Sequence, residues 1–182
     1  MTIEFKDDKF RELMLYVASQ MEDDPAFGAT VLNKVLFFSD FLAYRFWGQP
    51  ITGAVYQKLE YGPAPRRLLP EQEHLIAEQR AVMQVKDRGG YTQRRLVVLD
   101  KPNLDIFTAE EISLVDRVIA MLRGRGAWQA SEISHGVSVG WHAAELREEI
   151  RYGTVFLTPP KNPTPSQEVR AKELDAAYAT AG

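Results

Sequence analysis

One segment, residues 29–46, constrains the fold of this chain more than any other. Its apolar side chains point to all sides of a helix: Val31, Leu32, Val35, Leu36, Phe37, Phe38, Phe41, Leu42, Tyr44 and Phe46. A helix that is apolar all round must be covered by other elements on most sides. The segment also contains Lys34, Asp40 and Arg45, and these charges exclude a membrane span. We therefore predict a central, buried helix.

Around this helix we predict further helices and one β-hairpin. Apolar residues at helical spacing indicate a helix over residues 7–21, and another is expected over 66–79. Alternating apolar and polar residues on both sides of a Gly-Gly turn indicate two antiparallel strands within residues 81–99. A shorter extended segment is expected at residues 55–59. The predicted fold class is α+β, mainly α-helical, with a helical core and a small antiparallel sheet built on the hairpin.

The C-terminal part of the domain predicts shorter elements. Thr108 and Glu111 have the spacing of a capping box, so a helix should begin there. Two short helices are expected at residues 131–135 and 139–149, and a short extended piece at 154–157.

A proline-rich linker follows the predicted domain. Pro159, Pro160, Pro163 and Pro165 indicate a stiff spacer. We therefore place one domain at residues 1–157 and a linker with a tail at 158–182. The tail has a helical composition but few apolar residues, so a helix there would be marginal by itself.

The residue types that carry most catalytic chemistry are scarce. The chain has no cysteine and three histidines, which excludes thiolate nucleophiles and leaves no dense set of metal ligands. The Gly-Val-Ser-Val-Gly run at residues 136–140 has the spacing of a nucleophile elbow. No core strand is expected before Ser138, and the last histidine, His142, is too near to complete a triad. We expect no enzyme activity, no cofactor and no metal.

A winged helix-turn-helix is the alternative interpretation of residues 130–157, and it would make the protein a DNA-binding regulator. Residues 139–149 would form the recognition helix and residues 152–157 the wing. The charge argues against it, because 139–149 holds one arginine and three glutamates, which phosphates repel. With a net charge of −3, nucleic acid is an unfavoured partner for the whole chain.

Two regions contain residues that protein interfaces favour. Tyr and Arg side chains surround the rigid Pro63–Pro65 turn: Tyr56, Tyr61, Arg66 and Arg67. Tyr and Arg are enriched among the residues that dominate binding energy. In the alternative interpretation, Tyr61 and Pro63 only pack the turn onto the central helix.

The second region is the hairpin. Residues 80–101 hold six Lys or Arg and two Asp, a net charge of +4, and Arg88, Arg94 and Arg95 are its candidate contact residues. Such a patch would attract an acidic partner, although a solvated surface explains the same charges.

The N-terminal residues are acidic and polar, without the basic start and apolar run of a signal peptide. We therefore expect a cytoplasmic protein that does not enter membranes.

Three motifs in order resemble the SocA-like antitoxin family, the Panacea domain. The Leu-Asn-Lys-Val-Leu-Phe-Phe run at residues 32–38 is followed by Pro-Ile-Thr-Gly at 50–53 and Tyr-Gly-Pro-Ala-Pro at 61–65. Further on, a Thr-x-x-Glu-capped helix precedes Ser-His and, six residues later, Trp141. Ala54 departs from the acidic residue that often follows Pro-Ile-Thr-Gly, and Phe-Phe-Ser stands where Tyr-Phe-Ala is common.

The resemblance implies a bacterial or phage antitoxin that neutralises a cognate toxin by direct binding. Some relatives instead deliver the toxin to a protease, so a protease is a second implied partner. The resemblance names neither the toxin nor the contact surface. His135 and Trp141 are expected to be a structural pair, with Trp141 covering the core and His135 bonded to a backbone group.

Overall fold

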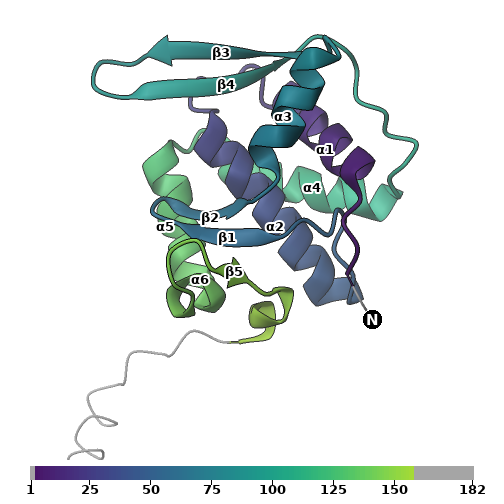
Figure 1. The fold of residues 1–182 in the computed structure, drawn as a ribbon, viewed down its shortest axis with the longest axis vertical. Coiled ribbons are helices and arrows are strands. Elements are labelled where there is room, and N and C mark those ends of the chain that lie inside the picture. Colours follow the sequence, from purple (N-terminus) through teal and green to yellow (C-terminus); the bar gives the residue numbers. More distant parts are fainter. Residues whose placement is uncertain (1–2, 158–182) are drawn as a thin grey trace, which may run out of the picture.

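Helix α2 is the axis of the fold, and the other elements cover it on several sides (Figure 1). The computed structural model describes residues 3–157. Its elements are α1 (Asp7–Gln20), α2 (Ala29–Trp47), β1 (Tyr56–Leu59), β2 (Gly62–Pro65), α3 (Leu68–Ala77), β3 (Ala81–Asp87), β4 (Thr92–Val98), α4 (Ala109–Leu122), α5 (Ala127–Val137), α6 (Val139–Ala143), β5 (Glu149–Ile150) and the 3₁₀ helix η1 (Tyr152–Phe156). The predicted α+β class, mainly helical, is confirmed.

The prediction of a central buried helix is also confirmed. Apolar side chains of α2 are buried together with those of α1 and α4 in one core. Gly48 ends α2 in the left-handed conformation, with a φ of 72°, which glycine adopts without steric cost. The capping box at α4 forms as expected, because Thr108 accepts from the Glu111 amide and Glu111 accepts from the Thr108 amide.

The strands form two sheets, which corrects the prediction of one sheet built on the hairpin. β3 and β4 make the predicted hairpin, but they stand apart as a two-stranded sheet. The second sheet has the order β2-β1-β5, and both of its strand pairs are antiparallel. β2 contains Pro63 and Pro65, which a strand tolerates because β2 lies at the sheet edge.

The end of the domain departs from the prediction in three places. Helix α5 is longer than expected, α6 stops at Ala143, and residues 152–156 form a 3₁₀ helix where an extended piece was expected. The cause is pairing at a distance: Ile150 pairs with Tyr56 of β1, so the chain must leave the helical path before residue 149. Arg147 makes this turn with a positive φ of 67°.

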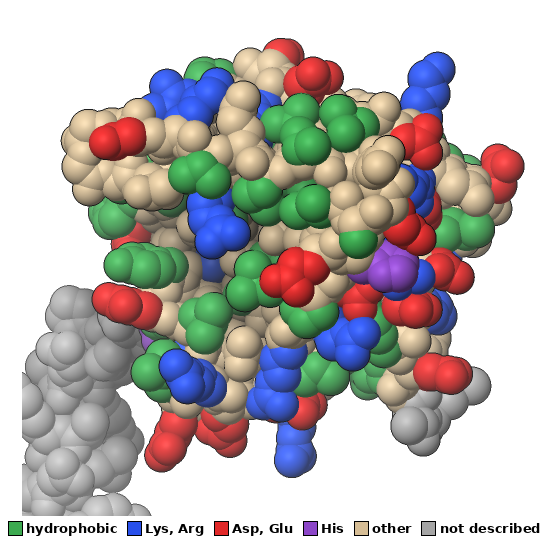
Figure 2. Space-filling model, turned by 45° about the horizontal axis from the view of Figure 1, so that its top comes forward, with side chains coloured by type: hydrophobic (Ala, Val, Ile, Leu, Met, Phe, Trp, Pro, Cys, Tyr) green, Lys and Arg blue, Asp and Glu red, His purple; other side chains and the backbone are tan. Residues whose placement is uncertain are grey.

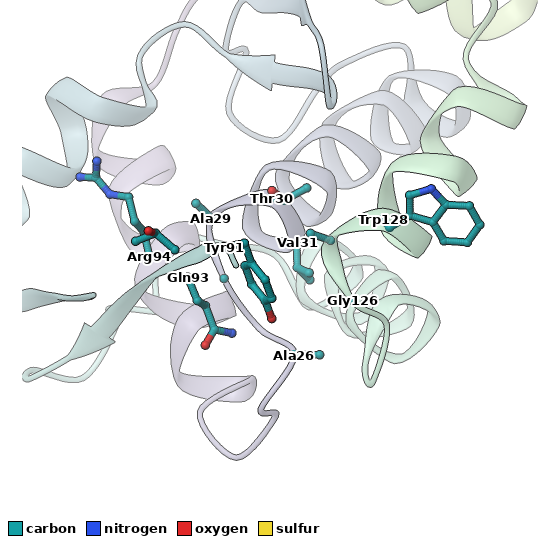
Figure 3. A pocket seen from close by; sticks show the side chains of 12 residues that line it. Ala26, Ala29, Thr30, Val31, Tyr91, Gln93, Arg94, Gly126 and Trp128 are labelled. Carbon is teal, nitrogen blue, oxygen red and sulfur yellow. The ribbon is translucent and has the colours of Figure 1, made fainter. Parts of the chain in front are cut away.

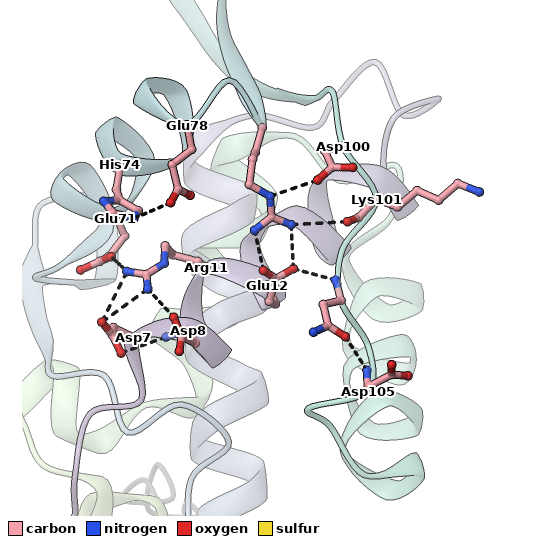
Figure 4. Close-up of polar contacts among 12 residues, drawn as sticks. Asp7, Asp8, Arg11, Glu12, Glu71, His74, Glu78, Asp100, Lys101 and Asp105 are labelled. Carbon is pink, nitrogen blue, oxygen red and sulfur yellow. Dashed lines mark hydrogen bonds and ion pairs between the residues drawn. The ribbon is translucent and has the colours of Figure 1, made fainter.

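Buried and half-buried ion pairs join α1 to the elements that lie over it (Figure 4). Glu71 of α3 accepts from Arg11 at 2.8 Å and from Arg67 at 2.6 Å. Glu12 accepts two hydrogen bonds from Arg80, at 2.6 and 3.1 Å. Part of the predicted basic charge of residues 80–101 is therefore neutralised within the domain. On the face that Figure 2 shows, basic side chains also lie among acidic and hydrophobic ones.

The predicted linker and tail at residues 158–182 lie outside the described residues. Among the helices of residues 3–157, none is both long and apolar enough to cross a membrane.

Candidate partner-binding site

The turn between β1 and β2 presents an exposed tyrosine on a tightly held backbone. Leu59 pairs with Gly62, so Glu60 and Tyr61 form the two-residue connection. The Tyr61 side chain is 68% exposed. The alternative role, in which Tyr61 packs the turn onto α2, is therefore wrong for the side chain, although the Tyr61 backbone does contact α2.

Lys34 of α2 lies directly beneath this turn. Its Nζ atom donates to the carbonyl oxygens of Tyr61 at 2.6 Å and Pro63 at 3.2 Å. Ser131 of α5 donates a further hydrogen bond to the Tyr61 carbonyl at 2.9 Å. Lys34 is only 1% exposed, and burial lowers the pKa of Lys34 to about 7. Two helices therefore fix the position of the turn.

Only glycine fits after Tyr61. Gly62 has a φ of +100°, and a Cβ atom there would lie 2.5 Å from Nζ of Lys34. Tyr61, Gly62 and Lys34, which all belong to the family motifs, therefore depend on one another. Gly62 leaves the space that Lys34 needs to reach the Tyr61 carbonyl.

A second buried charge connects α2 to the Pro-Ile-Thr-Gly segment. The Asp40 carboxylate accepts from the Thr52 amide at 2.7 Å and hydroxyl at 2.5 Å, from the Tyr56 hydroxyl at 2.9 Å and from the Tyr152 hydroxyl at 3.4 Å. Burial raises the pKa of Asp40, and these hydrogen bonds oppose the rise because they favour the charged form. Asp40 therefore links α2, β1 and η1. In the same segment, a Cβ atom on Gly53 would clash with the Glu4 carbonyl.

The Ser-His and Trp motif forms the other support of the turn. The rings of His135 and Trp141 stack at 3.8 Å, and Trp141 Nε1 donates to the Leu59 carbonyl at 3.2 Å. The structural pair is as expected, and Trp141 packs half-buried against the core. The expected bond from the His135 ring to the backbone is wrong: among the described residues His135 Nε2 has no partner, and burial lowers the pKa of His135.

The predicted contact residues of the first region have different surroundings. Arg66 and Arg67 are exposed but lie at the other end of the β1–β2 hairpin from Tyr61, where Arg66 donates to the Arg147 carbonyl and Arg67 to Glu71. Tyr56 is 1% exposed and bonds to Asp40. Its buried side chain does not reach a partner directly, which corrects the prediction for Tyr56, and its hydroxyl joins β1 to α2 through Asp40.

The arginines of the hairpin also differ from one another. Arg95 donates to the backbone carbonyls of Asp24, Met21 and Glu22, which ties β4 to the segment after α1. Arg88 donates to Gln93 within the hairpin. Arg94 is exposed and is the one best placed for a partner.

The structure also bears on three kinds of site that the sequence did not favour. Ser138 has a capping role, because its hydroxyl accepts from the Trp141 amide at the start of α6. Within residues 3–157, no group of three His, Asp or Glu side chains could hold a metal ion. The winged helix-turn-helix lacks both a recognition helix and a wing, because α6 has only five residues and residues 152–156 form the 3₁₀ helix η1.

Comparison with protein-family models decides the family. The model for the antitoxin SocA-like Panacea domain matches residues 32–142, more than half of the chain. The chain belongs to the SocA-like antitoxin family. The match begins at the α2 segment that holds Lys34 and ends just after Trp141, so it contains all the motif residues around the turn. Curated proteins and solved structures give no match. An antitoxin role follows from membership.

Sequence reasoning missed the two buried charges as parts of this site. Lys34 and Asp40 were used to exclude a membrane span, and Lys34 was quoted within the family motif at residues 32–38 without being given a role. Their signal was available, because a charge inside a helix that is apolar all round must find buried partners. Tyr152, which donates to the Ala54 carbonyl at 2.7 Å, gave no comparable signal.

Proposed function

We propose that this antitoxin neutralises its toxin by binding it directly, at a surface centred on Tyr61, without catalysis. The observation that carries the proposal is the exposed Tyr61 ring on a backbone fixed by Lys34 and Ser131. The exposed Tyr61 side chain is not needed for packing the core, whereas most of the other motif residues around it are buried. This contrast favours a binding role for Tyr61.

The physical advantage of this arrangement is preorganisation. A side chain on a mobile loop loses conformational entropy when it binds, whereas a turn held by buried hydrogen bonds has already lost most of it. Tyrosine buries a large ring and keeps a hydroxyl for hydrogen bonding, which is why it dominates many interfaces. Arg66 and Arg67 are exposed at the far end of the same hairpin, where their charges can steer an acidic partner toward this face.

Growth rescue tests the function itself. We expect the protein to restore growth when it is co-expressed with the product of a neighbouring reading frame that is toxic alone, and to co-elute with it in size-exclusion chromatography. Rescue without a complex would contradict direct neutralisation. Rescue that disappears in a protease-deficient host, with the complex still formed, would show that the protein acts as an adaptor for proteolysis.

A further inference from the structure

A groove separate from the Tyr61 turn lies between the β3–β4 hairpin and two helix N-termini. It has a volume of about 470 Å³, within the roughly 300–1,000 Å³ typical of ligand pockets. Its walls come from β4, the first turn of α2 and the first turn of α5: Ala26, Gly28, Ala29, Thr30, Val31, Tyr91, Thr92, Gln93, Arg94, Gly126, Ala127 and Trp128. Figure 3 shows Tyr91 and Trp128 on either side of Val31.

Two exposed aromatic rings flank this groove. Trp128 is 74% exposed, more than any other large hydrophobic side chain of residues 3–157, and Tyr91 is 59% exposed. Exposed tryptophan is unfavourable in water, and tryptophan and tyrosine are the side chains that most often dominate interfaces. An apolar side chain of a partner would cover both rings.

The charge of the groove selects the partner. Arg94 is the one charged residue among those that line it, and no Asp or Glu lines it; Arg94 extends outward from one end (Figure 3). Arg88 lies next to the lining residue Gln93, to which it donates. The nearest acidic group in sequence, Asp24, is buried and accepts from the amides of Ala26 and Gly124.

The two helix N-termini add to this preference. Gly28 and Gly126 are the N-cap residues of α2 and α5, and neither has a side chain that caps the helix. The first turns of α2 and α5 hold no acidic residue, so the positive ends of the two helix dipoles add to the charge of Arg94. The Gln129 side chain accepts from the Gly126 amide, and the Asp24 carboxylate, near both helix starts, is already bonded to two backbone amides.

We infer that this groove binds an acidic protein segment that inserts one large apolar side chain between Tyr91 and Trp128. A protein segment fits better than a nucleic acid, because the lining is mainly apolar and offers one cation, whereas a nucleic-acid site needs a basic track along the backbone. The inference goes beyond the proposed function, because it concerns a surface that does not include Tyr61.

Selection from a displayed library of random twelve-residue peptides on the full-length protein tests the inference. We expect the sequences enriched on the wild type over the Trp128→Ala variant to carry a net negative charge and one Trp, Phe or Leu. An enriched peptide, synthesised with a fluorescent label, should lose about tenfold or more in affinity with Trp128→Ala and with Arg94→Glu. Its binding should weaken as salt is raised.

Trp47→Ala is the matched control, because Trp47 is an exposed tryptophan (45%) that does not line this groove. It should bind the peptide as the wild type does, and so should Tyr61→Ala, which separates this surface from the toxin site. No enrichment over Trp128→Ala, enriched peptides without acidic residues, or full binding by Arg94→Glu would overturn the inference. So would a labelled single-stranded oligonucleotide that binds more tightly than the peptides.

Discussion

The two hairpin turns of this protein look alike in sequence and differ in what lies beneath them. Each presents an exposed tyrosine, Tyr61 at 68% and Tyr91 at 59%, beside a glycine with positive φ. Below the first turn, buried Lys34 and Ser131 bond to its backbone. At the second turn, a Cβ atom on Gly90 would meet nothing within 4 Å.

The difference separates two ways to present an aromatic ring. A turn held from below presents its ring in one position and gains affinity from preorganisation. The second hairpin is joined to the core along β4, where Gln93 donates to the carbonyls of Pro25 and Phe27, and its turn has no comparable buried support among the described residues. The family motifs lie around the first turn, and several of their residues, such as Lys34 and Trp141, hold its backbone in place.

The largest expected effect comes from removing the buried acceptor below β1. Asp40→Ala leaves the Thr52 amide and hydroxyl and the Tyr56 hydroxyl without their acceptor, whereas the Tyr152 hydroxyl keeps the Ala54 carbonyl. We expect the free energy of unfolding to fall by about 4 kcal/mol or more. Urea denaturation followed by circular dichroism measures it. Asp23→Ala is the control, because Asp23 pairs with Arg123 at the surface, and it should cost less than about 1 kcal/mol. Equal losses in both variants would contradict the account.

Because Lys34 is buried below the first turn, the stability of the protein should depend on pH. The pKa of Lys34 is lowered to about 7 in the folded protein, against about 10.4 in an unfolded chain. Between these values the unfolded state binds more protons, so the stability that depends on Lys34 should rise with pH, by at most about 1.4 kcal/mol per unit. Below pH 7 this contribution is constant.

The measurement is the free energy of unfolding between pH 6 and 9 for the wild type and for Lys34→Met. The wild-type curve should rise relative to that of Lys34→Met across pH 7 to 9. Parallel curves over the whole range would show that Lys34 is not desolvated beneath the turn.

Glycine substitutions compare the space below the two turns. Gly62 and Gly90 have similar positive φ values, 100° and 115°, so alanine costs similar backbone strain at both. Only at Gly62 would the added Cβ meet Lys34 Nζ. We expect Gly62→Ala to lower the unfolding free energy by about 1–3 kcal/mol more than Gly90→Ala. Thermal and urea unfolding of the two variants measure the difference, and equal costs would show that the first turn is not held from below.

The smallest effect on stability is expected at the exposed rings. Tyr61→Ala and Tyr91→Ala should each change the unfolding free energy by less than about 0.5 kcal/mol, because neither ring is buried. A loss of about 2 kcal/mol or more at Tyr61 would mean that its ring packs the turn after all.

The sequence predicted the helical frame because its signals were local. The apolar run of α2 and the capping box at Thr108 need no distant residue to be recognised. The sheet β2-β1-β5 escaped prediction because β5 has two residues and exists only through its pairing with Tyr56. Because Ile150 pairs with Tyr56, α6 ends at Ala143, before the predicted end at residue 149.

The position of the site was predictable from the sequence, but the role of each residue in it was not. Composition drew attention to the Tyr- and Arg-rich turn, yet it does not distinguish Tyr56, which supports from the core, from Tyr61, which is exposed. That distinction depends on where β1 ends, because Tyr56 lies on the strand and Tyr61 in the turn that follows it. Trp128 was overlooked because the predicted helix began at residue 131 and left it outside, whereas α5 begins at Ala127.

The toxin affinity of folded Tyr61→Ala tests the central claim most directly. Phe46→Ala is the matched control, because Phe46 is 61% exposed and lies twelve residues along α2 from Lys34, about 18 Å along the helix. Isothermal titration of the co-encoded toxin should show that Tyr61→Ala loses about 2 kcal/mol or more of binding free energy while Phe46→Ala loses less than about 0.5 kcal/mol. A folded Tyr61→Ala protein that binds the toxin as tightly as the wild type would contradict the account.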